Sequence, residues 1–148
     1  MKFFLYGHNG SGNHGCEAIV RSTYKILNKN NLNEFTLATN GKKEDENYGL
    51  NNIINLKEEK NNVSKINYNY IKAYLSLKLF KNELLSEELV YKKTFENVDK
   101  DTIALSIGGD NYCYPGYERF IMLHNILSRR GIKTVLWGCS VEPRKKLI

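Results

Sequence analysis

A glycine-rich loop, Gly7-His-Asn-Gly-Ser-Gly-Asn-His-Gly15, constrains the fold of this chain more than any other stretch. It follows Lys2–Tyr6, a short apolar run that is typical of a strand buried on both faces of a parallel sheet. Glycines allow close approach of the backbone to a ligand and tolerate positive φ values. A helix beginning near Gly15 would direct its unpaired N–H groups and positive dipole end toward that strand. The stretch therefore predicts a strand, a loop and a helix, with an anionic or hydroxyl-rich ligand at the loop.

The remaining sequence repeats the order of strand, loop and helix. The helix after the first loop carries an apolar stripe from Cys16 to Leu27. Lys42–Glu46 is expected to be a surface loop. Further strands are predicted at Glu34–Thr39, Asn52–Leu56, Thr102–Ile107 and Lys133–Trp137, and further helices at Ile66–Phe80, Leu84–Phe95 and Tyr117–Arg130. In the helix at Ile66–Phe80, we expect the tyrosines to serve helix packing rather than to form an aromatic platform for a sugar.

This order, with glycine at the strand exits, predicts an α/β fold with a doubly wound, mostly parallel, Rossmann-like sheet, spanning 1–148 as one domain. Ligands in such sheets lie outside the carboxyl ends of the strands. Three loops leave predicted strand ends at Gly7–Gly15, Gly108–Asn111 and Gly138–Ser140. We therefore expect these three loops to meet at one crevice.

Two nucleotide-binding motifs fail on inspection. The letters from Gly10 to Gly15 satisfy G-x-G-x-x-G, but the end of the second strand is Thr39-Asn40 instead of the acidic residue that holds a ribose. A nicotinamide or flavin cofactor is thus disfavoured. A P-loop is excluded because no Gly-Lys-Ser/Thr follows the glycines.

Several side chains near the loops are candidates for chemistry. Asp110 follows two glycines and would deprotonate or grip a hydroxyl group, or else cap the next turn. His14 would contact a ligand or carry a proton, and the dipole of the first helix stabilises Glu17. Cys16, Cys113, Cys139 and His14 lack the short spacing of a zinc site, so no metal is expected.

Composition limits the class of protein. The chain has 148 residues, 41% hydrophobic and 26% charged, as globular proteins do, and a net charge of +6 that favours anionic partners. No nucleic-acid module or basic–aromatic stripe is present, so no nucleic-acid partner is expected. Three cysteines, an odd number without close spacing, are typical of reduced thiols, and together with the lack of a secretory signal they favour a cytoplasmic location. No segment is long enough to span a membrane, although peripheral membrane association is compatible with the charge.

Three segments together resemble the polysaccharide pyruvyl transferase family. The first is Gly12-Asn-His-Gly15 with Glu17-Ala18, where Cys16 replaces the commoner Asp of the family. The second is Gly108-Gly109 after the strand at Thr102–Ile107, and the third is Gly138 with Pro143 after the last strand. Their order along the chain, each at a strand exit, carries the resemblance.

The resemblance implies one half of a two-domain fold like that of GT-B glycosyltransferases, with this chain as the amino-terminal half and the second domain absent. It implies transfer of a pyruvyl group from phosphoenolpyruvate to a sugar hydroxyl of a bacterial surface polysaccharide, with no cofactor. Basic residues and a His for the donor are then expected mainly in the second half. Asp110 would be catalytic, and the residues lining the substrate site would be Gly10, Gly12, Asn13, His14, Gly15, Glu17, Gly108, Gly109, Asn111 and Gly138. The alternative is a non-catalytic sugar- or nucleotide-binding domain of the same fold.

Overall fold

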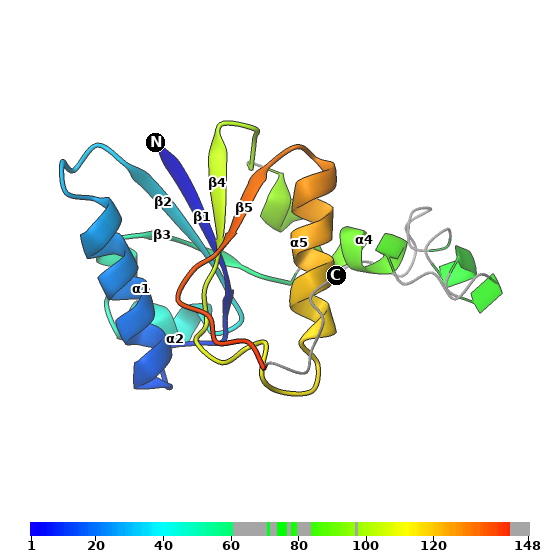
Figure 1. Ribbon diagram of the computed structural model, residues 1–148, viewed down its shortest axis with the longest axis horizontal. Coiled ribbons are helices and arrows are strands. Elements are labelled where there is room, and N and C mark those ends of the chain that lie inside the picture. The colour runs from blue at the N-terminus through cyan, green and yellow to red at the C-terminus, as the bar shows by residue number, and fades with distance from the viewer. Residues whose placement is uncertain (61–70, 72–73, 77, 80–83, 97, 143–148) are drawn as a thin grey trace.

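A parallel sheet forms the centre of the protein in a computed structural model that describes residues 1–60, 71, 74–76, 78–79, 84–96 and 98–142 (Figure 1). Its strands are β1 (Lys2–His8), β2 (Glu34–Thr39), β3 (Asn55–Glu58), β4 (Thr102–Ser106) and β5 (Lys133–Leu136). They are ordered β3-β2-β1-β4-β5, and every neighbouring pair is parallel. The helices are α1 (His14–Leu27), α2 (Lys42–Asn47), α4 (Leu84–Phe95) and α5 (Glu118–Arg129), with a 3₁₀ turn, η1, at Leu50–Asn52. The predicted α/β Rossmann-like class is confirmed.

The side chains of β1 alternate between two apolar layers because successive residues of a strand point to opposite faces. Phe3 and Leu5 belong to the layer that contains Val20 of α1. Phe4 and Tyr6 belong to the layer that contains Tyr91 of α4 and several residues of α5. Helices α1 and α5 accordingly lie on opposite sides of the sheet in Figure 1. With both faces covered, a continuous apolar run is the pattern that β1 requires.

The element boundaries agree closely with the sequence in most places. The bounds of β2 and α4 are those predicted, β4 and β5 each end one residue earlier, and α5 is one residue shorter at both ends. β1 runs two residues further than predicted, to His8, which is buried. The third strand is shifted, because Leu50–Asn52 forms a 3₁₀ turn and pairing with β2 begins only at Asn55.

The prediction of a surface loop at Lys42–Glu46 is wrong. This stretch forms α2, a helix of six polar and charged residues that lacks any apolar period. Asp45, one of its six residues, is fully buried and forms hydrogen bonds with two residues of the first loop. Tertiary contacts therefore stabilise this short helix, which local sequence would not.

The predicted helix at Ile66–Phe80 falls largely outside the described residues, including Tyr68 and Tyr70. Residues 71, 74–76 and 78–79 are described and helical. The apolar face that we expected to pack is exposed there, Tyr74 by 51%. The prediction that this helix face packs against the protein is therefore wrong for its described apolar side chains, which are Ile71, Tyr74, Leu75 and Leu79. Within the described part of the chain, no helix is long and apolar enough to cross a membrane.

Candidate functional site

The loops that follow β1, β4 and β5 meet at one edge of the sheet. Asn111, after β4, donates from Nδ2 to the carbonyl oxygen of Gly7 in β1 at 2.7 Å. Ser140, after β5, donates its backbone N–H to the carbonyl oxygen of Gly109 at 2.5 Å. Because β1, β4 and β5 are adjacent and parallel, their carboxyl ends share this edge. The predicted convergence of the three loops is found.

Glycine is required where the loop after β4 packs against the loop after β1. Gly108 has φ +129, and a Cβ atom on it would lie 2.1 Å from Asn111 Nδ2 and 2.8 Å from the carbonyl oxygen of Gly7. Gly109 follows with φ +52, and a Cβ atom there would lie 3.5 Å from Ile19 of α1. Close packing of the backbone therefore explains the two glycines Gly108 and Gly109, which lie between β1 and α1 at the end of β4.

Asp110 is exposed beside the beginning of α1. Burial raises the pKa of the Cys16 thiol, and the negative charges of Asp110 and Asp45 raise it further. A hydrogen bond to the Asp110 carboxylate raises the pKa of Tyr114, an exposed phenol. Asp110 is therefore a solvent-accessible carboxylate with one hydroxyl neighbour, at the edge where the loops meet.

Asn13 begins α1 as its N-cap. Its side-chain oxygen accepts a hydrogen bond from the backbone N–H of Gly15 at 2.9 Å. Capping of this kind satisfies one of the unpaired N–H groups at a helix start. The amide oxygen of Asn13 is therefore engaged within the chain, and its NH₂ group is the part left for a ligand.

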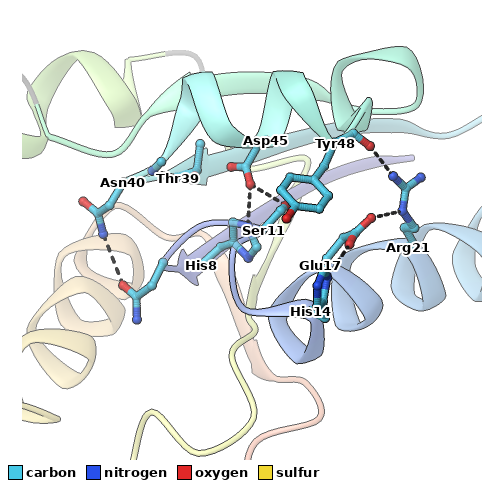
Figure 2. A network of polar contacts seen from close by, with 11 residues as sticks. His8, Ser11, His14, Glu17, Arg21, Thr39, Asn40, Asp45 and Tyr48 are labelled. Atoms are coloured by element: carbon cyan, nitrogen blue, oxygen red, sulfur yellow. Dashed lines mark hydrogen bonds and ion pairs between the residues drawn. The ribbon is translucent and has the colours of Figure 1, made fainter.

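His14 and Glu17 form a cluster with Arg21 that faces α2 (Figure 2). Glu17 accepts from Arg21 Nε at 2.7 Å, and Arg21 donates to the Tyr48 carbonyl oxygen at 2.5 Å. The ring of His14 lies edge-on to Tyr48, with 5.7 Å between centroids. The hydrogen bond from Arg21, aided by His14, lowers the pKa of Glu17. The helical period turns His14 and Arg21 to the side of α1 away from Cys16, the residue of this helix whose thiol the charge of Asp110 affects.

The carboxylate of Glu44 rests on the glycines of the first loop. A Cβ atom on Gly12 would lie 2.1 Å from Glu44 Oε1, and one on Gly10 would lie 2.3 Å from Oε2. A Cβ atom on Gly41 would lie 3.0 Å from the same Oε2. These glycines therefore leave room for an acidic side chain of the protein itself, which sequence reasoning missed because Glu44 was assigned to a loop.

A buried polar cluster fixes the helix that carries Glu44. Asp45 Oδ1 accepts from Ser11 Oγ at 2.6 Å and bonds to His8 Nε2 at 3.0 Å, and all three residues are buried (Figure 2). Burial raises the pKa of Asp45, but hydrogen bonds from Ser11, Thr39 and His8 lower it by more. Ser11 donates to the carboxylate and not to the imidazole, so this is no nucleophile activated by histidine. The cluster holds the first loop against α2.

A second polar cluster joins the exits of β1, β2 and β3 to the start of α5. Glu59, directly after β3, accepts from Arg119 Nη2 at 2.7 Å and from Asn40 Nδ2. Asn40 also donates to Asn9 Oδ1 at 3.4 Å. Burial raises the pKa of Glu59 against the opposing effect of Arg119. The sequence did not reveal this cluster, because the third strand was predicted to end at Leu56 and Arg119 was read as part of a helix.

Comparison with known families decides the assignment. The family model described as polysaccharide pyruvyl transferase matches residues 13–147. The chain belongs to the polysaccharide pyruvyl transferase family. Searches of curated proteins and of solved structures gave no significant match.

The family match covers most of the loops described above. In this pyruvyl transferase family member it includes the β4 exit, with Gly108, Gly109, Asp110 and Asn111, and Gly138 after β5. It begins at Asn13, so the buried glycine Gly10 and the exposed Gly12 lie before it. Among the described residues, no group of three or more His, Cys, Asp or Glu side chains is arranged to hold a metal ion, and no disulfide joins Cys16, Cys113 and Cys139.

Proposed function

We propose that this pyruvyl transferase family member transfers a pyruvyl group from phosphoenolpyruvate to hydroxyls of a surface polysaccharide or its precursor. The reaction takes place at the shared carboxyl edge of β1, β4 and β5. Family membership supports a donor and a sugar acceptor. The observation that carries the location is the meeting of three loops around an exposed carboxylate, Asp110.

Asp110 acts on the acceptor. Its carboxylate accepts the proton of a sugar hydroxyl while that oxygen attacks C2 of phosphoenolpyruvate and C3 takes up a proton. A second hydroxyl of the sugar then displaces the phosphate group, and the proton of that hydroxyl leaves with the inorganic phosphate. The products are a cyclic pyruvyl ketal and phosphate, with no change of oxidation state and no cofactor.

The remaining loop residues hold this edge in shape. Asn111 ties the β4 exit to β1, and Gly108 permits that contact. Gly138 and the exposed Gly12 present their backbone to a ligand, Glu44 occupies the Cβ side of Gly10 and Gly12, and Asn13 offers its NH₂ group. Glycines, amides and carboxylates dominate these loops, so we further propose that basic residues for the donor come from a second, GT-B-like domain. Three cysteines that form no disulfide with one another favour a cytoplasmic site of action.

The test is saccharide-dependent release of inorganic phosphate from phosphoenolpyruvate by the full-length protein, with the ketal product identified by mass spectrometry. Removal of a general base costs about 10²–10⁴-fold in rate, so we expect Asp110→Asn to lose that much kcat. Its thermal unfolding should match that of the parent protein, because Asp110 is exposed. Asp101→Asn, at an exposed carboxylate before β4, is the matched control.

Two outcomes would contradict this proposal. Turnover of Asp110→Asn at the parent rate would remove this carboxylate from the chemistry. Saccharide or nucleotide binding by the parent protein without any phosphate release from phosphoenolpyruvate would favour the alternative of a non-catalytic binding domain.

A further inference from the structure

The second polar cluster, which consists of Asn9, Asn40, Glu59 and Arg119, is assembled from four separate parts of the chain. Asn9 follows β1, Asn40 follows β2 and Glu59 follows β3, while Arg119 lies in the first turn of α5. Glu59 and Arg119 are 60 residues apart in sequence and are joined by an ion pair of 2.7 Å. All of the strands concerned are parallel, so the cluster lies along the same edge of the sheet as Asp110. It extends the site toward β3.

Glu59 is a buried anchor within this cluster. Its side chain is 1% exposed, whereas 28% of the Arg119 side chain is exposed and Asn9 and Asn40 are exposed. Glu59 uses only Oε2 for Asn40 and Arg119, and its buried Oε1 has no hydrogen-bond partner among the described residues. The buried Nε of Arg119 is likewise without one. Buried polar groups are usually satisfied, so this cluster has unused hydrogen-bonding capacity.

The cluster is continuous with the β1 and β4 loops. The guanidinium of Arg119 lies 5.0 Å above the ring of Phe120. That ring is packed near the backbone of Gly7, where a Cβ atom would lie 3.4 Å from it, and Gly7 is the residue that Asn111 bonds. Three contacts, Arg119 to Phe120, Phe120 to Gly7 and Gly7 to Asn111, therefore connect Arg119 to the loop that presents Asp110.

Charge indicates which ligand suits these groups. The Glu59 carboxylate offsets the charge of Arg119, so the four residues of the cluster together carry no net charge, and Lys60 is the further cation that acts on Glu59. Asn amides both donate and accept hydrogen bonds, and Arg donates in a fixed fork. Such a set matches neighbouring hydroxyl groups, which also both donate and accept. A neutral polyol fits these residues better than the donor phosphoenolpyruvate does.

We propose that Asn9, Asn40 and Arg119 bind hydroxyl groups of the saccharide acceptor, with Glu59 as the positioning residue that holds Arg119 and Asn40 in place. This inference rests on the proposed function for the role of the saccharide. It adds an acceptor subsite on the β1–β3 side of the edge, beside the carboxylate that takes the hydroxyl proton.

The experiment measures KM for the saccharide and KM for phosphoenolpyruvate separately in the full-length protein. Loss of a neutral hydrogen bond corresponds to about a 2- to 10-fold change and loss of a charged one to about a 10- to 100-fold change. We expect Asn40→Ala to raise the saccharide KM by the smaller factor and Arg119→Gln by the larger. The donor KM should stay within about 2-fold, well below the loss of one hydrogen bond to a charged group.

Matched controls come from the same helix. Arg129→Gln and Asn125→Ala alter exposed residues of α5 farther along the chain and should leave both KM values unchanged. Glu59→Gln keeps the size of the anchor but removes its charge, and should raise the saccharide KM as Arg119→Gln does. Because Glu59 is buried and Asn40 donates to it, the thermal unfolding of Glu59→Gln and Asn40→Ala is measured beside their KM values, and only variants that stay folded at the assay temperature are compared.

Direct binding separates this inference from the proposed function. Methyl β-galactopyranoside, which has a diol that a ketal can bridge, should shift the side-chain amide NMR signals of Asn9 and Asn40, even if no phosphate is released. Absence of phosphate release with these shifts present would reject the transferase reaction and retain the subsite. A raised donor KM in Arg119→Gln with an unchanged saccharide KM would overturn the subsite, as would unshifted amide signals in a protein that turns over.

Discussion

Replacement of Asp45 tests whether a buried carboxylate holds the glycine loop against α2. Asp45 is 0% exposed and is bonded to Ser11 at 2.6 Å and to His8 at 3.0 Å. Hydrogen bonds to a charged group contribute about 1.5–3 kcal/mol each, and neutral ones about 0.5–1.5 kcal/mol. Asp45→Asn keeps the shape but weakens both bonds, so we expect a loss of about 2–3 kcal/mol in the free energy of unfolding.

Urea unfolding at neutral pH measures this loss, and with ordinary m-values the midpoint should fall by about 1 M or more. Glu46→Gln is the control, because it removes an exposed carboxylate from the same helix and should change the midpoint little.

The pH dependence gives the sign of the effect. The pKa of Asp45 in the folded protein lies below its ordinary value of 3.8. A lowered pKa contributes stability that is complete above 3.8 and is lost as the pH falls through the folded-state value. The difference between the parent protein and Asp45→Asn should therefore be constant near neutrality and shrink below pH 3.8. A difference under about 0.5 kcal/mol at neutral pH, typical of a surface change, would refute this reasoning.

Two further predictions concern the loops. Asn111→Ala should lower the free energy of unfolding by about 1–3 kcal/mol, because the Gly7 carbonyl loses its hydrogen-bond donor. Thermal unfolding and phosphate release, measured on the same variant, would show whether stability and turnover fall together. An unchanged melting temperature would contradict the role of this hydrogen bond in joining the two loops. Gly12→Ala should lower stability by less than about 1 kcal/mol, because the contacting Glu44 carboxylate is at the end of an exposed side chain that can rotate away. Turnover should fall nonetheless and should not be restored by adding Glu44→Ala. Full recovery in the double variant would show that the glycine serves only to accommodate Glu44.

Local sequence patterns predicted most of the strands and helices correctly. The apolar run at Thr102–Ser106 forms β4, and the Arg and Gly residues near position 130 mark the end of α5. These signals depend on residues close in sequence, such as strand alternation, helix period and caps. The meeting of the three glycine loops followed as well, because parallel strands bring their carboxyl ends to one edge.

Long-range polar contacts were not accessible from the same patterns. Asp45 finds Ser11 and His8 at separations of 34 and 37 residues, and nothing in the polar stretch around it signals a buried carboxylate. Glu59 and Arg119 are 60 residues apart. His14 and Glu17 stand beside the glycines in sequence, yet the helical period turns them toward Tyr48. The closeness of His14 and Glu17 to the glycines in sequence therefore did not determine which way their side chains point.

The strand order has a consequence for how the molecule assembles. Strand β1 occupies the middle of the sheet, and one of its two edges is matched by residues 34–39, which are close to it in sequence. Its other edge waits for residues 102–106, and closing so long a loop carries an entropy cost before any contact repays it. Pairing of that second edge is therefore the step that brings Asp110 and Arg119 to the half already formed by Gly10 and Glu59.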